Sequence, residues 1–228
     1  MTMSSDDLFN LFEQLNISVV THHHTPTFTV EEGRDLKASL PGGHSKNLFM
    51  KDKAGQIVLI SANAGPSQIA GKLCDEDFFS TSWQNDQTPM AMGEVLNRQG
   101  VKSLYVMAPN YAAGKDMVAG VERTFKGEIV GKDLTKWGAD AQLDFSAELA
   151  KAKASGADGI FVFYPGAAGG AFIKQYDQAG LKDTLPLYSV FTVDALSLPK
   201  LQAAGLTGVL GSRTTQEWDP TLDNAANK

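Results

Sequence analysis

A strand-loop-helix pattern that recurs along residues 101–212 is the feature that most constrains the fold of this chain. Residues 101–109, VKSLYVMAP, contain a short apolar run that Pro109 ends, and residues 111–125 repeat apolar side chains with the 3.6-residue period of a helix. Further strand candidates follow at residues 127–131, 159–163, 187–191 and 207–212, with helix candidates between them at 144–155, 168–179 and 194–204. The alternation predicts an α/β fold with a doubly wound parallel sheet of five strands, flanked by helices on both faces.

Ligands of such open sheets bind outside the carboxyl ends of the strands. The loops expected at that edge are residues 110–111, 164–166 and 191–194. Tyr111 follows the central strand, and its phenol offers a flat apolar face and a hydroxyl, which suit a small amphiphilic ligand. The alternative, left open by the sequence, is that its ring only packs the following helix against the sheet.

Nucleotide and triad chemistry find little support in the sequence. The Gly-rich loop at residues 166–170 lacks the Lys-Ser/Thr of a phosphate loop, and no acidic residue closes the next strand to hold a ribose. A close helix-strand approach explains its glycines. No histidine follows His44, so the residues after it contain no Ser-His-Asp triad. We also expect no cofactor.

The first 60 residues predict a small α/β appendage to the sheet. Residues 4–15 read as a helix with acidic residues in its first turn, residues 17–21 as a short strand, and Thr29 as the cap of a second short helix. Strands at residues 46–51 and 56–61 are expected to form a hairpin whose turn ends at Gly55. Further along, Thr88 is the expected cap of a helix that ends at Gly100.

Two motifs in this appendage carry a resemblance to a known family. The strings THHHTPTFTVEE (residues 21–32) and LPGGHSKNLFMKD (residues 40–52) resemble the opening of the YbaK/prolyl-tRNA editing family over about residues 5–60. The resemblance implies an aminoacyl-tRNA deacylase with Lys46 as its functional lysine and tRNA as a partner. An ammonium at Lys46 would anchor or polarise an ester or phosphate, whereas the plain reading is a surface lysine at a strand end. The later strands and pocket loop of that family are missing here.

Metal and disulfide chemistry are not expected. Adjacent residues on a strand point to opposite faces, so His22, His23 and His24 do not form a coordination shell, and no second cluster completes one. Cys74 is the single cysteine, which excludes an intrachain disulfide.

The rest of the chain resembles the type I periplasmic solute-binding proteins of branched-chain amino-acid ABC transporters, above all those for hydrophobic or aromatic ligands. The resemblance runs from about residue 60 to 228. It rests on ISANAGP (60–66), FSTSWQNDQTP (79–89), APNYAAGKD (108–116), LDFSAEL (143–149) and FVFYPG (161–166). It implies a carboxy-terminal lobe without most of the amino-terminal lobe. The chain therefore resembles a chimera, in which residues 1–60 are a partial YbaK-like domain and residues 61–228 are a periplasmic-binding-protein-like lobe.

The second resemblance also implies ligand-binding residues. Tyr111 matches a tyrosine that faces the ligand, and Asn63 and Ala64 belong to a loop that holds the ligand carboxylate. Tyr164 and Asp194 lie in loops that meet the ammonium and the side chain of the ligand, with Thr192 as the alternative to Asp194. The implied ligand is a small, hydrophobic or aromatic, amino-acid-like molecule, and a transporter permease is the implied partner.

Charge and hydropathy limit the remaining classes. A net charge of -6 and a pI near 5.2 argue against a nucleic-acid partner held by a basic face. No apolar run reaches the roughly 18 residues of a membrane helix, and the amino terminus lacks a signal peptide's basic and apolar regions, so the chain as written is expected to be cytoplasmic. A ligand-binding module with a weak or incomplete site is favoured over an enzyme. The deacylase and an inactive scaffold remain as alternatives.

Overall fold

The computed structural model describes residues 5–14, 16, 18–20, 22–23, 47–51, 55–61, 65–195, 197–217 and 223. The chain divides into two compact units, Met1–Ala62 with Asp77–Phe79, and Asn63–Glu76 with Ser80–Lys228. Several predictions fall outside the described residues: the helix capped by Thr29, the functional lysine Lys46, and the loop residues Asn63 and Ala64.

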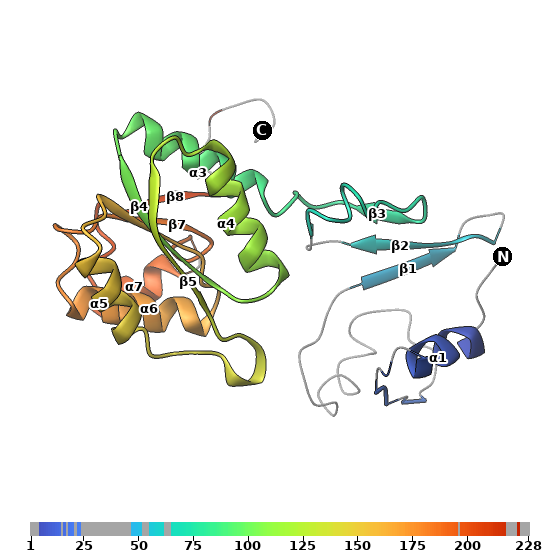
Figure 1. Ribbon diagram of the computed structural model, residues 1–228. Coiled ribbons are helices and arrows are strands. Elements are labelled where there is room, and N and C mark those ends of the chain that lie inside the picture. The colour runs from blue at the N-terminus through green and yellow to red at the C-terminus, as the bar shows by residue number, and fades with distance from the viewer. Residues whose placement is uncertain are drawn as a thin grey trace. The chain divides into compact units, whose positions relative to one another are not determined.

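The first unit contains a helix and a three-stranded sheet (Figure 1). Helix α1 spans Ser5–Gln14 and carries Asp6 and Asp7 in its first turn, where carboxylates complement the helix dipole. Strands β1 (Asn47–Lys51) and β2 (Ile57–Ser61) pair antiparallel, and β3 (Phe78–Ser80) lies beside β2. Gly55, before β2, has a φ of +90°. The predicted first helix and hairpin are confirmed.

The strand predicted at residues 17–21 is wrong for its described part, because residues 18–20 are not in a strand. Val19 and Val20 are exposed. β-branched residues favour strands through packing against neighbouring strands and burial, so their propensity alone does not form a strand where that packing is absent.

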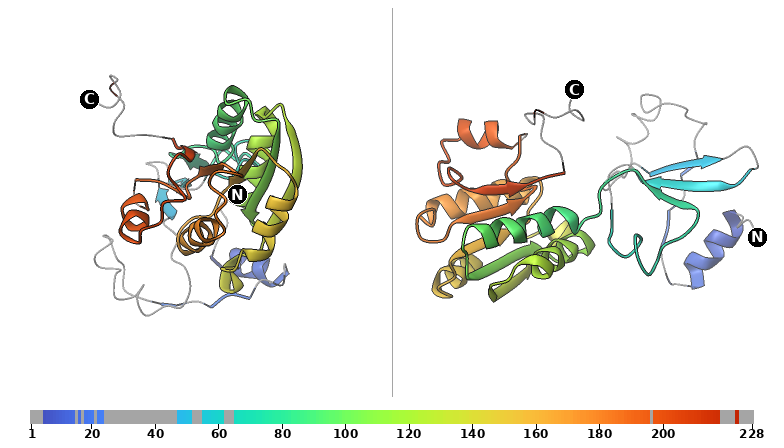
Figure 2. Two further views of the ribbon diagram at one scale, coloured as in Figure 1. Left: turned by 90° about the vertical axis from the view of Figure 1, so that its left-hand side faces the viewer. Right: turned by 90° about the horizontal axis from the view of Figure 1, so that it is seen from above.

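The second unit is the predicted parallel sheet, with strand order β5-β4-β6-β7-β8 (Figures 1 and 2). Every described pairing within it is parallel. In sequence order, β4 comes first, β5 pairs with one side of it, and β6, β7 and β8 follow on the other side. The strands are β4 (Ser103–Pro109), β5 (Glu128–Thr135), β6 (Gly159–Val162), β7 (Leu187–Val190) and β8 (Arg213–Thr215).

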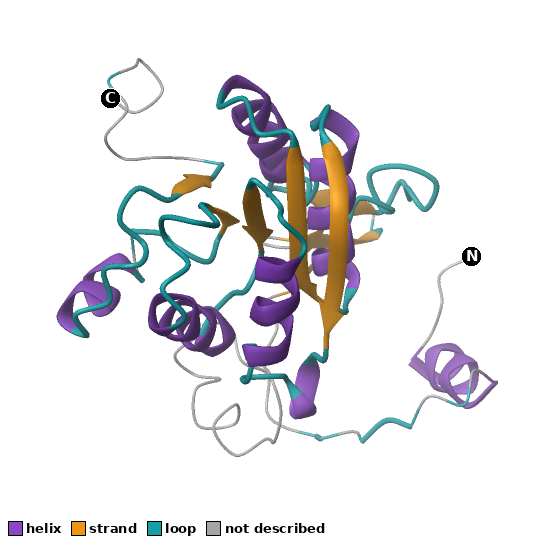
Figure 3. Ribbon diagram, turned by 60° about the vertical axis from the view of Figure 1, so that its left-hand side comes forward, coloured by secondary structure: helices purple, strands orange, loops and turns teal. Residues whose placement is uncertain are grey.

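Helices cover both faces of this sheet (Figure 3). Alternate side chains of a strand point to opposite faces. On β4, Leu104 and Val106 therefore join one core, while Tyr105 and Met107 join the other. The first core contains α3 (Gln87–Arg98) and α4 (Ala112–Thr124), and the second contains α5 (Ser146–Ala154), α6 (Ala167–Gln178) and α7 (Leu198–Ala203).

Several boundaries in this unit differ from the sequence predictions; β5, for example, runs to Thr135 instead of ending at residue 131. Helix α3 begins at Gln87, after Asp86 and not after Thr88, because the Asp86 carbonyl already accepts the Met90 N–H at 3.0 Å. The last strand is Arg213–Thr215, whereas residues 208–211 form turns from which Val209 buries its side chain. The strand itself is polar and mostly exposed, because it is an edge strand that pairing with β7 holds in place.

Candidate functional site

The reversal of strand order places a switch point between β4 and β6, where ligands of open α/β sheets bind. The loop after β4 contains Asn110 and Tyr111, and the loop after β6 leads through Gly166 into α6. Gly169, in the first turn of α6, lies against the carbonyl oxygen of Tyr164 so closely that a side chain would collide with it. Gly169 therefore allows α6 to approach the strand end closely, as predicted, whereas a side chain at Gly166 or Gly170 would meet open space.

A cavity of about 520 Å³ opens beside this switch point, at the carboxyl ends of β6 and β7. Its volume is within the range of small-molecule sites. The walls come from the loop after β6, the start of α6, the loop after β7 and helix α7. The lining residues are Gly166, Ala167, Gly170, Phe191, Thr192, Asp194, Ser197, Lys200 and Leu201.

The polar wall of the cavity carries Asp194, Ser197 and Lys200. The Asp194 carboxylate accepts the Ser197 N–H at 2.7 Å, and the Ser197 hydroxyl accepts the Asp194 N–H at 2.9 Å. This reciprocal pair holds the start of α7, as a capping box does. A carboxylate and an ammonium group thus line one wall, a combination that can complement the charges of a small acid or amino acid.

Thr192, the alternative to Asp194, has a structural role. It is 4% exposed, and its Oγ1 accepts the Tyr164 N–H at 2.8 Å while lying 3.3 Å from the Val190 carbonyl oxygen, to which it donates. These bonds tie the loop after β7 to the loop after β6.

A continuous run of aromatic rings leads from Tyr111 to the cavity. The Tyr111 ring stacks on Trp137 with centroids 4.6 Å apart and lies 6.4 Å from Phe163. Phe163 lies 6.4 Å from Phe191, whose ring is 5.5 Å from that of Trp83. Phe191 lines the cavity and has a φ of +53°, a strained conformation for a residue other than glycine. Of these rings, Phe191 lines the cavity beside its polar wall, and Phe163 and Trp83 pack against Phe191.

Tyr111 is half-buried in this run and lies at the amino end of α4. Burial raises the pKa of its hydroxyl to about 12, so the group is neutral at physiological pH and can both donate and accept a hydrogen bond. Because Trp137 already covers part of its ring, both the expected ligand-facing role and the packing role are compatible with the geometry.

The ring of Tyr164 belongs to the core rather than to the cavity wall. It is 1% exposed and packs on Phe145 and Phe172, and its hydroxyl shares a 3.1 Å hydrogen bond with Thr135. Burial raises the pKa of this hydroxyl well above its usual value. The ring shares the core on one face of the sheet with Ile160 and Val162. This alternation continues past the end of β6, so that Phe163, which the sequence reading did not single out, faces the aromatic run.

Sequence reasoning also missed Trp83, Trp137, Ser197 and Lys200. Trp83 lay within a quoted motif, but nothing local showed that it would meet Phe191. Lys200 carried a weak signal, because a helix was expected over residues 194–204 after a strand-end loop.

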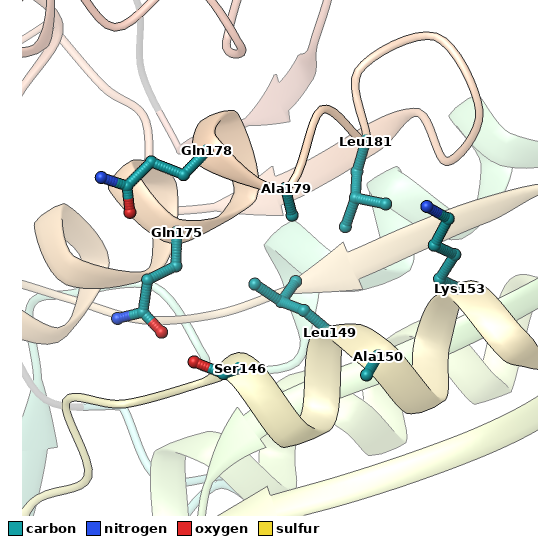
Figure 4. A pocket seen from close by; sticks show the side chains of 8 residues that line it. All are labelled: Ser146, Leu149, Ala150, Lys153, Gln175, Gln178, Ala179 and Leu181. Atoms are coloured by element: carbon teal, nitrogen blue, oxygen red, sulfur yellow. The ribbon is translucent and has the colours of Figure 1, made fainter.

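A second cavity, of about 360 Å³, lies between α5 and α6 (Figure 4). Leu149, Ala179 and Leu181 face the space between the helices, and Lys153 and Gln175 stand at its rim. The Gln175 amide is occupied, since it accepts the Phe145 N–H and donates to the Leu143 carbonyl, each at 2.7 Å. This groove is away from the carboxyl ends of the strands.

Metal binding has no basis in the described part of the chain, where no group of three or more His, Cys, Asp or Glu side chains could hold an ion. The same residues include no helix long and apolar enough to cross a membrane.

The periplasmic binding protein family model matches residues 48–228, which include both cores of the parallel sheet and the strand-end loops. The chain belongs to the periplasmic binding protein family. A curated member, the Leu/Ile/Val-binding protein homolog 6 of Brucella abortus, is 29% identical over 181 residues, which are 77% of this chain and 44% of that protein. The chain thus spans less than half the length of the curated relatives it matches.

Solved structures of periplasmic binding proteins show the same fold. An ABC-transporter solute-binding protein from R. palustris in complex with benzoate is 30% identical, with a TM-score of 0.64, covering 74% of this chain and 45% of that one. A second from R. palustris, in complex with 4-hydroxybenzoate, is 27% identical with the same TM-score and coverage.

These findings correct the assignment of the first 60 residues in part. The family match begins at residue 48, so most of β1 and all of β2 fall within it. They give no support to the resemblance to the YbaK/prolyl-tRNA editing family, to tRNA as a partner or to a chimeric origin.

Proposed function

We propose that residues 63–228 form one lobe of a solute-binding protein, and that the cavity beside β6 and β7 is this lobe's share of the ligand site. The observation that carries the proposal is the aromatic run that ends at a wall bearing Asp194 and Lys200. An apolar surface with a few convergent polar groups is the usual construction of a small-molecule site.

The ligand class we propose is a small hydrophobic or aromatic carboxylic acid or amino acid. The Lys200 ammonium complements a carboxylate, while Phe191 and the rings behind it complement an apolar body. If the ligand is an amino acid, its ammonium group is placed at the Asp194 oxygens. The neutral Tyr111 hydroxyl and the loop containing Asn63 and Ala64 complete the proposed set.

The affinity of this chain alone is expected to be low. A complete site of micromolar affinity corresponds to about -8.2 kcal/mol, and half of that free energy leaves a dissociation constant of about 1 mM. An ABC permease is the partner that we propose from the family, as the recipient of the bound ligand.

A ligand screen by NMR tests the proposal. The chain is titrated to about 20 mM with each of four ligands: benzoate, 4-hydroxybenzoate, L-leucine and L-phenylalanine. We expect at least one of them to give saturable shifts with a dissociation constant of about 1–5 mM. The matched amides benzamide and leucinamide, in which a carboxamide replaces the carboxylate, control for the carboxylate. Equal responses to acids and amides, or none to any ligand, would reject the proposed ligand class.

Deacylation is not proposed for this chain. Its proposed lysine, Lys46, lies outside the described residues, and the family findings concern a different activity.

A further inference from the structure

Asp116, on α4, is a buried carboxylate with an unusual set of neighbours. It is 4% exposed and accepts three hydrogen bonds, from the Ser67 N–H at 3.1 Å, the Gln68 side-chain amide at 3.0 Å and the Asn85 side-chain amide at 3.0 Å. All three partners act as donors, and the two Asp116 carboxylate oxygens act as their acceptors. Asp116 therefore joins two segments, residues 65–68 and 83–85, to α4.

The two joined segments also pair with each other. The Asn85 N–H donates to the Gly65 carbonyl at 2.7 Å, and Gly65 lies so close to the Trp83 carbonyl oxygen that a side chain at position 65 would collide with it. The backbone around Trp83 is thus held at Gly65 and at Asn85, and Asp116 adds hydrogen bonds to both segments, at Ser67 and at the Asn85 side chain.

Trp83 connects this arrangement to the cavity. Its ring lies 5.5 Å from that of Phe191, which lines the cavity in a left-handed backbone conformation. A strained residue keeps its conformation only when its surroundings hold it. The contact with Trp83 is one such restraint, and it comes from the segment that Asp116 holds.

We propose that Asp116 is a positioning residue for the ligand cavity, which it shapes by holding Trp83 against Phe191. The expected effect of Asp116 on ligand affinity rests on the proposed function. Its expected effect on the contact between Trp83 and Phe191 does not depend on any ligand. Asp116 itself does not line the cavity.

Asp116→Asn is the test, and Asp158→Asn is the matched control. The amide at position 116 would place a donor against donors. Asp158 undergoes the same chemical change and also accepts backbone N–H groups, those of Lys102 and Ser103 at 2.9 Å, but at the opposite ends of the strands. Asn85→Ala is a milder second variant that removes one of the three donors, in case Asp116→Asn does not fold.

The readouts are NMR signals and affinity for the probe 4-hydroxybenzoate. Asp116→Asn and Asn85→Ala should shift the Trp83 indole and Phe191 amide signals, assigned with Trp→Phe and Phe→Leu variants, and leave the Trp137 indole in place. They should weaken the probe's affinity by on the order of threefold or more, because a loosened support displaces the binding wall. Asp158→Asn should do neither, even if it lowers the melting temperature as much.

Each outcome decides the proposal. Unmoved Trp83 and Phe191 signals in both variants would overturn it, as would moved signals with unchanged probe affinity. If the wild-type chain binds none of the four proposed ligands, the proposed function fails separately, and the Trp83 and Phe191 signals alone decide whether Asp116 shapes the wall.

Discussion

Truncation of Tyr111 separates a ligand-contacting ring from a core ring. A fully buried aromatic side chain costs about 3–5 kcal/mol when replaced by alanine. Tyr111 is only partly buried, which reduces that figure, and its stacking on Trp137 at 4.6 Å is included in the loss. We therefore expect Tyr111→Ala to lower the free energy of unfolding by about 2 kcal/mol, a fall in melting temperature of about 4–8 °C for a domain of this size.

Tyr111→Phe is the matched variant, because it keeps the ring and its stacking and removes only the hydroxyl. We expect its unfolding free energy to stay within about 0.5 kcal/mol of wild type, while the affinity for 4-hydroxybenzoate falls about three- to tenfold, the value of one lost hydrogen bond. Urea unfolding measures the first quantity and NMR titration the second. A loss above about 4 kcal/mol for Tyr111→Ala, with unchanged affinity for Tyr111→Phe, would show a purely structural ring and refute the ligand-facing role.

Three further predictions concern residues around the cavity and the sheet. Tyr164→Phe should destabilise the protein by about 1 kcal/mol in urea unfolding, because the Thr135 hydroxyl loses its partner. It should leave ligand affinity unchanged, and a loss of affinity would show that Tyr164 takes part in binding. Lys200→Ala should weaken benzoate at least about threefold by NMR titration while changing stability by less than about 0.5 kcal/mol, and equal affinity for both proteins would remove Lys200 from the site. The pKa of Asp158 is lowered by the N–H groups of Lys102 and Ser103, so its stabilisation is present above the unfolded pKa of about 4 and is lost as pH falls through the folded pKa. Urea midpoints of wild type and Asp158→Asn should accordingly converge on acidification, and a constant gap would contradict this sign.

The sheet could be predicted from sequence because its central strands are buried on both faces. The apolar runs that become β4, β6 and β7 are bounded by glycine or proline, and amphipathic segments of helical length separate them. The hairpin was predictable for a similar reason, since Gly55 adopts the positive φ expected of the residue that ends the turn.

Boundaries set by tertiary contacts were not predictable. The apolar residues around Val209 predicted a strand, yet they lie in turns, and the Val209 side chain is buried in the core. The polar segment Arg213–Thr215 instead forms the edge strand, through backbone pairing with β7. An edge strand needs no apolar pattern, so local sequence gives little sign of it.

The candidate site was predictable in location and only partly in its residues. Parallel topology alone placed the loops after β4, β6 and β7 at one edge, and Asp194 and Phe191 line the cavity there. The core position of the Tyr164 ring follows from strand alternation, which assigns residues 160, 162 and 164 to the same face, and its role at the ligand stays a prediction. The contact between Trp83 and Phe191 joins residues 108 positions apart and left no local pattern.

The most direct test of the binding-lobe assignment is a ¹H–¹⁵N chemical-shift titration of the whole chain with 4-hydroxybenzoate. We expect saturable shifts at Gly166, Phe191, Asp194 and Ser197, with a dissociation constant on the order of 1 mM. Saturable shifts confined to the groove between α5 and α6, around Leu149 and Gln175, would contradict it.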